Sequence, residues 1–176
     1  HEVVLVARLD DWHKCIKRAL QIWDIVQRNT ELQNWTLRII GSGPDEGYYK
    51  NYVTKNHIPH VVFEGKQDPQ RYYQDAELFM MTSISEGFSL TTLEASQYGC
   101  IPIAFDNFAS ARDIIRDGKN GLLIPNNDKL VYAEKMQLLM QDESLRESMR
   151  KQCIDMCERY TIDKVAQKWY QLFLSL

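Results

Sequence analysis

The order of short apolar runs and longer helical patterns along the chain constrains its fold more than any other feature. Six runs have the length and composition of β-strands, and the segments between them carry apolar residues at helical spacing. Strict alternation of strand and helix indicates parallel strands joined by helical crossovers. We expect an α/β fold, a Rossmann-like doubly wound parallel sheet of about six strands. The expected strands are residues 2–7, 35–40, 60–65, 77–83, 101–105 and 121–125.

The helices expected between these strands complete the alternation. Apolar runs such as VVLVA indicate strands that are buried on both faces of the sheet. No internal repeat, low-complexity tract or linker interrupts the chain, so we expect one domain over residues 1–176. The expected helices are residues 14–28, 45–56, a short helix opened by Pro69, 89–98, a short helix near 109–116, and a helical run from Asp128 with breaks near Asp142 and residues 160–161.

Composition excludes several classes of protein. Of 176 residues, 44% are hydrophobic and 26% charged, as in ordinary globular proteins. The net charge of −3 argues against nucleic acid as a partner, because phosphate backbones bind basic surfaces. No apolar run has the length of a membrane span, and no segment resembles a signal peptide, so we expect a cytoplasmic protein.

Neither the cysteines nor the histidines predict a metal site. The four cysteines lack CxxC spacing and are expected as small buried hydrophobes in a reducing compartment. The four histidines lack HExxH spacing, and Pro59 separates His57 from His60. We therefore expect a protein without a bound metal. The cysteines are Cys15, Cys100, Cys153 and Cys157.

Polar residues follow the expected strands at the point where each strand ends. Carboxyl ends of parallel strands share one edge of the sheet, where ligands of such folds bind, so we expect a crevice there. The GSGP turn after the second strand does not complete a dinucleotide fingerprint, since its third glycine would fall at Glu46, and a tight turn is favoured. The strand-end residues are Arg8, Gly41, Ser42, Gly43, Glu64, Gly65, Lys66, Ser83, Ser85, Glu86, Asp106 and Asn107.

The segment SEGFSLTTLEA places two carboxylates, Glu86 and Glu94, around the start of an expected helix. Free N–H groups at a helix start, with the helix dipole, favour phosphate, and Ser89 can cap that helix. Carboxylates accept hydrogen bonds from hydroxyl groups, so both features together fit a sugar nucleotide. Two solvated acids at a helix N-terminus are an equally weighted alternative. Arg8 and Lys14 are candidate cations for the diphosphate, although a merely charged loop also explains them.

Five segments in order resemble the C-terminal, donor-binding domain of a GT-B glycosyltransferase of the retaining family 4, the glycosyl transferases group 1. Each is similar to one motif of that family: G-R-L…K-G, V-G-x-G-P, V-x-F-x-G, E-x7-E and G-L-L-V…D. Two positions depart from the pattern, because Cys15 and Ser89 stand where the family usually has glycine. The segments are VARLDDWHKCIKRAL, LRIIGSGP, VVFEGKQD, SEGFSLTTLEASQYGCIPIAF and NGLLIPNND.

The resemblance implies a role for each matching residue. Arg8 and Lys14 match the basic pair that holds the donor diphosphate, and Glu86 matches the acid that contacts the transferred sugar. These three are the implied catalytic residues, and Glu94 matches the acid that holds the ribose. Further implied donor-binding positions are Gly41 and Gly43 in the turn, Glu64 and Gly65 at the strand end that frames the base, and Gly87, Phe88, Ser89 and Leu90 beside Glu86.

The activity implied is transfer, with retention of configuration and without a metal, from a UDP- or GDP-linked sugar to a glycan or lipid-linked acceptor. The chain begins at His1 with an apolar strand, and we expect it to be a piece that lacks the N-terminal acceptor domain. It should bind donor but turn over little. Peripheral membrane association of the whole protein, at the inner face, remains open. The alternatives are a non-catalytic nucleotide-sugar-binding module and a nucleotide-sugar epimerase of the same fold.

The final helical run, ending KVAQKWYQLFLSL, carries Trp169, Tyr170, Leu172 and Phe173. In the family that this chain resembles, the corresponding region often crosses back to the other domain. Simple packing on the chain's own sheet is an equally weighted alternative.

Overall fold

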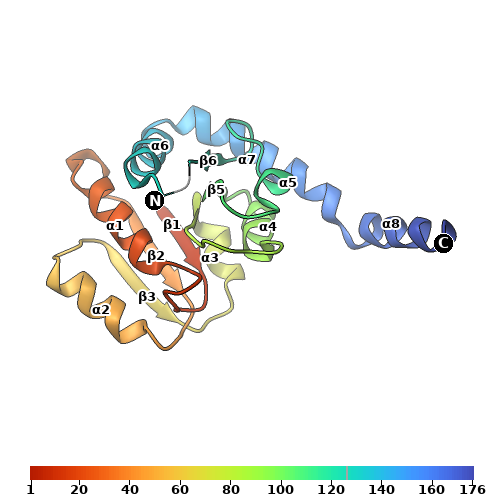
Figure 1. Ribbon diagram of the computed structural model, residues 1–176. Coiled ribbons are helices and arrows are strands. Elements are labelled where there is room, and N and C mark those ends of the chain that lie inside the picture. The colour runs from red at the N-terminus through yellow and green to blue at the C-terminus, as the bar shows by residue number, and fades with distance from the viewer. Residues whose placement is uncertain (126) are drawn as a thin grey trace.

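The computed structural model describes residues 1–125 and 127–176. Asn126, which belongs to the NGLLIPNND segment, lies outside the described residues. One six-stranded sheet runs through the molecule in the order β3-β2-β1-β4-β5-β6, and every neighbouring pair is parallel (Figure 1). This confirms the predicted Rossmann-like fold. The strands are β1 (Glu2–Val6), β2 (Thr36–Ile40), β3 (Val61–Gly65), β4 (Leu78–Met81), β5 (Ile101–Phe105) and β6 (Leu122–Ile124).

The helices lie where helical periodicity predicts them, within a few residues. The short 3-10 helix η1 (Thr30–Leu32) was not expected, and the side chain of Asn29 accepts a hydrogen bond from the backbone N–H of Glu31 at its start. The other helices are α1 (Ile16–Gln27), α2 (Glu46–Lys55), α3 (Gln70–Asp75), α4 (Leu90–Gln97), α5 (Ala111–Ile114), α6 (Lys129–Gln141), α7 (Glu143–Cys157), η2 (Glu158–Tyr160) and α8 (Ile162–Leu174).

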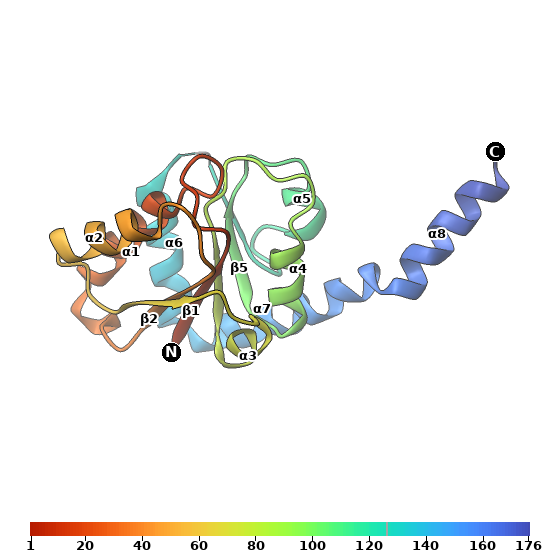
Figure 2. The same cartoon turned by 90° about the horizontal axis from the view of Figure 1, so that it is seen from below.

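Helices cover both faces of the sheet, and the core is divided accordingly. Figure 2 shows α1, α2 and α6 on one side of the strands and α4 and α5 on the other. In β1, Val3 and Leu5 belong to the first apolar cluster and Val4 to the second, because successive side chains of a strand point to opposite faces. Burial of both faces explains why the strands are continuously apolar.

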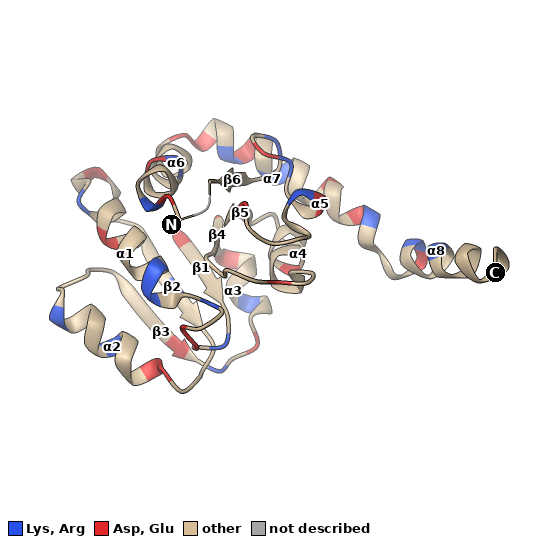
Figure 3. Cartoon of the chain, viewed as in Figure 1, with Lys and Arg blue, Asp and Glu red and all other residues tan. Residues whose placement is uncertain are grey.

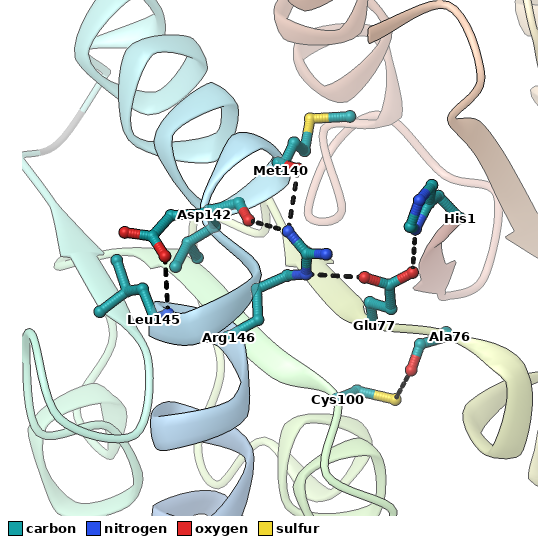
Figure 4. A network of polar contacts seen from close by, with 9 residues as sticks. His1, Ala76, Glu77, Cys100, Met140, Asp142, Leu145 and Arg146 are labelled. Carbon is teal, nitrogen blue, oxygen red and sulfur yellow. Dashed lines mark hydrogen bonds and ion pairs between the residues drawn. The ribbon is translucent and has the colours of Figure 1, made fainter.

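A buried arginine explains the predicted break near Asp142. Arg146 donates hydrogen bonds to the carbonyls of Leu139 and Met140, 2.7 and 2.9 Å away, which closes the last turn of α6. Its Nε atom also lies 2.7 Å from Glu77, which contacts His1 as well (Figure 4). Asp142 then caps α7. Asp142 is therefore both the C-cap residue of α6 and the N-cap residue of α7.

Three of the four cysteines lie in the core, as the sequence predicts, and all four are free thiols. Burial raises the pKa of Cys100 to about 12 and that of Cys157 to about 11, and it raises the pKa of Cys153 as well. Cys15 is only half-buried, at the start of α1.

Helix α8 projects away from the body of the molecule (Figures 1 and 2). None of its residues is buried, and its side chains Trp169 and Phe173 stack on each other with ring centroids 5.8 Å apart. The alternative that this segment packs on the chain's own sheet is therefore wrong. Among the described residues, no helix has both the length and the apolar character needed to span a membrane.

Candidate functional site

The loops that follow the strands meet where the strand order reverses. β1 lies between β2 and β4, so the crossovers from β1 and β4 leave in opposite directions and a crevice opens between their loops. A hollow of about 530 Å³, called the crevice below, lies at this edge. Loops after β1, β2 and β3 line it, together with one residue of α4. Its lining residues are Val6, Ala7, Arg8, Lys14, Ile40, Gly41, Ser42, Lys66, Gln67 and Thr91.

The crevice is basic although the chain is acidic. Its described lining includes Arg8, Lys14 and Lys66 and no carboxylate. Elsewhere Lys and Arg are interspersed with Asp and Glu along the helices (Figure 3). The side chain of Arg8 is 70% exposed, and its Nε atom lies 3.9 Å from Asp10. A guanidinium so loosely held is available to an anionic ligand.

Lys14, which lines the crevice, pairs with Glu86 from a loop far away in the sequence, although neither Glu86 nor residues 87–90 are among the lining residues. The Nζ atom of Lys14 lies 2.5 Å from Oε1 of Glu86, and both side chains are mostly buried, with 28% and 16% exposed. The two loops are tied by the Ile84 N–H, which donates to the His13 carbonyl at 3.0 Å. The Thr82 hydroxyl also donates to the Lys14 carbonyl, at 3.1 Å. The ion pair is therefore built on a fixed loop contact.

Cys15 gives the chain the sharp turn that brings Lys14 to this place. It precedes α1 with φ 52° and ψ 45°, the left-handed conformation that favours glycine. The resemblance noted glycine as the usual residue at this position. The backbone geometry supplies the physical reason for that preference.

Gly41 and Gly43 allow the loop after β2 to touch the loop after β1. A Cβ atom on Gly41 would lie 1.8 Å from the Ala7 carbonyl oxygen, and one on Gly43 would lie 2.3 Å from the Leu9 carbonyl oxygen. The interpretation of GSGP as a tight turn is confirmed. Gly41 lines the crevice, whereas Gly43 serves this backbone contact and is not among the lining residues.

Glu64 is held by the chain's own residues. Its carboxylate lies 2.5 Å from Arg38 and accepts a hydrogen bond from the Tyr72 hydroxyl at 3.1 Å. Gly65, at φ 71°, accepts the N–H of Gly41 at 2.8 Å, and neither Glu64 nor Gly65 lines the crevice. The next residues, Lys66 and Gln67, do line it. Lys66 was expected in the crevice as a strand-end residue, without a role in donor binding, whereas Gln67 was missed. The position of Gln67 close behind β3 was the signal that could have found it.

The start of α4 differs in detail from the prediction. Ser89 stands at the N-cap position, but its buried hydroxyl lies 2.8 Å from that of Thr92 and caps no backbone N–H. The N–H of Leu90 is also engaged, by the Phe88 carbonyl at 3.0 Å. The prediction that Ser89 caps the helix is therefore wrong, because its side chain turns into the core. Space around Gly87 is open, with no atom within 4 Å of the place of a Cβ atom.

Glu94 lies in a neighbouring pocket of about 280 Å³ on the other side of the loop after β3. The Tyr73 hydroxyl approaches its carboxylate at 3.4 Å, and burial, with the nearby charge of Glu94, raises the pKa of Tyr73. The structure thus brings Arg8, Lys14 and Glu86 together and places Glu94 beside them in a separate recess. Further lining residues of that pocket are Asp68, Pro69, Gln70, Gln97 and Tyr98.

Comparison with known proteins decides the family. A family model described as "Glycosyl transferases group 1" matches residues 1–156. The chain belongs to this family. Its six-stranded parallel sheet matches structures of GT-B glycosyltransferases, as the resemblance implied.

Two similar proteins are considerably longer than this chain. It is 29% identical over 171 residues to the poly(glycerol-phosphate) alpha-glucosyltransferase of Bacillus subtilis (strain 168), covering 96% of this chain and 25% of that protein. The pneumococcal O-GlcNAc transferase GtfA, solved with UDP and GlcNAc, superposes with a TM-score of 0.86 at 26% identity, covering 97% of this chain and 35% of that one.

A third comparison shows similarity of fold alone. The C-terminal domain of the glycosyl transferase group 1 family protein LpcC from Francisella tularensis has a TM-score of 0.80 at 22% identity. The alignment covers 92% of this chain and 87% of that domain. The chain therefore spans about a quarter to a third of the first two proteins and most of the LpcC domain.

Proposed function

We propose that this chain is the C-terminal, donor-binding half of a retaining family 4 glycosyltransferase. It binds a UDP- or GDP-linked sugar and takes part in transferring that sugar to a glycan or lipid-linked acceptor. The observation that carries the proposal is the basic crevice at the reversal point of the sheet, whose lining residue Lys14 is paired with Glu86. Family membership supports the reaction class.

Arg8 and Lys14 hold the donor diphosphate in this proposal. Arg8 supplies a planar fork that suits two phosphate oxygens, and Lys14 supplies a point charge. Lys66, after β3, adds a third cation to the lining. As the bond to the sugar breaks, negative charge grows on the leaving diphosphate, and these cations stabilise it. The chain's own cations thus do the electrostatic work, and the proposed reaction uses no metal.

Glu86 and Glu94 accept hydrogen bonds from the donor's hydroxyl groups. Glu86 stands beside Gly87, whose open surroundings leave room for a sugar ring against the backbone. A diphosphate at Lys14 competes with Glu86 for the same ammonium group and frees the carboxylate for the sugar. Glu94, in the neighbouring pocket, is placed to hold the ribose. The UDP bound in pneumococcal GtfA supports a uridine donor.

The acceptor site belongs to a part of the protein outside this chain. The Bacillus subtilis glucosyltransferase and pneumococcal GtfA are about three to four times as long as this chain, and an isolated C-terminal domain from LpcC has the same fold. The apolar face of α8, which includes Trp169 and Phe173, meets no partner among the described residues and would pack on the acceptor half. We also propose that the protein is cytoplasmic and that the whole protein attaches peripherally to the membrane.

Calorimetric titration with UDP, GDP, ADP and UDP-linked sugars tests the proposal. We expect selective binding of one nucleotide, weakened about tenfold or more in Arg8→Ala and in Glu94→Ala, because each loses a charge-assisted hydrogen bond. Arg28→Ala is the matched control, since Arg28 forms an exposed pair with Asp24 on α1. If neither this chain nor its full-length parent binds any nucleotide, the proposal is wrong. A Glu86→Gln parent that binds donor without transferring sugar separates an enzyme from a mere binding module.

A further inference from the structure

An aromatic contact joins the loop of the proposed donor site to the base of the projecting helix. Phe88, in the loop after β4, is 41% exposed, and its ring centroid lies 5.4 Å from that of Tyr160 at an interplanar angle of 59°. Tyr160 belongs to η2, directly before α8. Aromatic pairs at this distance and angle attract each other beyond the apolar area they bury.

Tyr160 is itself held firmly. Its hydroxyl donates to the Asp113 carbonyl of α5 at 3.0 Å. Three residues earlier, the Cys157 thiol approaches the Leu93 carbonyl of α4 at 3.5 Å, so the end of α7 is fixed on the helix that follows the loop. Burial raises the pKa of Tyr160 above its ordinary value. The ring of Tyr160 is thus a fixed surface against which Phe88 can rest.

The loop on the other side of the contact has few such supports. It runs from Ser85 to Ser89, and Gly87 meets nothing where a side chain would stand. Glycine permits many backbone conformations, so the side chains of its neighbours must select one of them. Glu86 precedes Gly87 and is paired with Lys14, and Phe88 follows it and rests on Tyr160. A ligand that takes Lys14 removes the first support and leaves the second.

We propose that Tyr160 is a positioning residue for the loop 85–89, acting through Phe88, so that the loop keeps its shape when the donor displaces Glu86 from Lys14. The inference deepens the proposed function and rests on it for its consequence in donor binding. Tyr160 lies beyond residues 1–156, the part matched by the family model. Tyr160 does not line the crevice.

Hydrogen exchange of the 176-residue chain tests the positioning directly. In Tyr160→Leu we expect the hydrogen-bonded amides that flank the loop, those of Ile84 and Leu90, to exchange about threefold to tenfold faster, the factor that an aromatic pair contributes to an equilibrium. Tyr160→Phe keeps the ring but loses the hydrogen bond to Asp113, so its exchange should lie between that of wild type and that of Tyr160→Leu. Tyr52→Leu is the matched control, because Tyr52 is a half-buried tyrosine on α2 with one tilted ring neighbour, Tyr48. Unchanged loop exchange in Tyr160→Leu, with or without a lower melting temperature, overturns the inference.

Nucleotide titration of the same variants separates this inference from the proposed function. We expect Tyr160→Leu and Phe88→Leu each to weaken binding of a UDP-sugar by about threefold to tenfold, and the double variant to be no weaker than either. Additive losses, or equal affinity in Tyr160→Leu and wild type, contradict the inference. If neither the wild-type chain nor its full-length parent binds a nucleotide while Tyr160→Leu still loosens the loop, the proposed function fails and the positioning role stands.

Discussion

Cys15 shows how one backbone conformation at the residue scale supports the site. Its φ of 52° turns the chain before α1 and sets Lys14 toward Glu86. A residue with a Cβ atom pays roughly 1–2 kcal/mol for this conformation, whereas glycine adopts it freely. We expect Cys15→Gly to raise the free energy of unfolding by about 1 kcal/mol, measured by denaturant unfolding.

Cys15→Ala is the control for this prediction, because it removes the thiol and keeps the Cβ atom. The Cys15 thiol approaches the Asp11 carbonyl at 3.6 Å, a weak contact whose loss should cost little. We expect Cys15→Ala to be less stable than Cys15→Gly. Equal stability of the two variants would show that backbone strain at this position is negligible.

The Lys14–Glu86 pair gives a second prediction at the residue scale. Because Glu86 occupies the ammonium group and adds negative charge beside the crevice, it opposes a free nucleoside diphosphate. We expect Glu86→Gln to bind UDP about fivefold more tightly, ~1 kcal/mol, in calorimetric titration. Glu94→Gln, the matched control, should bind more weakly. Weaker UDP binding in Glu86→Gln would mean that Glu86 supports the diphosphate and does not compete with it.

How much of the site was predictable depends on what sets each residue's position. Arg8, Lys14 and Glu86 were expected to meet, because residues after parallel strands share one edge of the sheet. The placement of Glu94 in a separate pocket was not expected. It depends on which way α4 turns its side chains and on the position of the Tyr73 ring. Lys66 was seen at a strand end, but its direction follows from the loop after β3, which sequence periodicity does not describe.

At the scale of elements, α8 is the helix whose contribution to stability is smallest. All of its residues are at least partly exposed, and it leaves the body after η2. We expect removal of residues 161–176 to change the free energy of unfolding by less than about 1 kcal/mol, since no core contact is lost. Denaturant unfolding of the shortened chain measures this. Met149→Ala, on the neighbouring α7, is the contrasting control and should cost about 2–5 kcal/mol.

A large loss of stability on removing residues 161–176 would mean that α8 packs on the body in solution. The sequence could not distinguish these outcomes beforehand. The residue pattern of an apolar stripe at helical spacing is the same whether the stripe packs on the chain's own sheet or on a second domain. By contrast, the six strands and the breaks near Asp142 and Tyr160 follow from local periodicity and capping, so the sequence alone was sufficient to predict them.

At the scale of the whole molecule, the proposal predicts that binding and turnover are separable. The 176-residue chain holds the basic crevice, and full-length relatives are longer. We expect its turnover with donor and acceptor to be at least about 100-fold below that of the full-length parent, because the acceptor is not oriented against the donor. A coupled assay of nucleoside diphosphate release, run on both proteins, measures the ratio. Comparable rates would refute a two-domain enzyme.

The projecting α8 also has a consequence for engineering. A helix that shares no core with the rest of its chain can be exchanged without rebuilding that core, so Thr161 is a natural junction for chimaeras. Under the proposed function, we expect that grafting the corresponding helix of a relative onto residues 1–160 would change which acceptor half this chain pairs with and leave its donor crevice unchanged. Donor choice and acceptor choice would then be separately exchangeable.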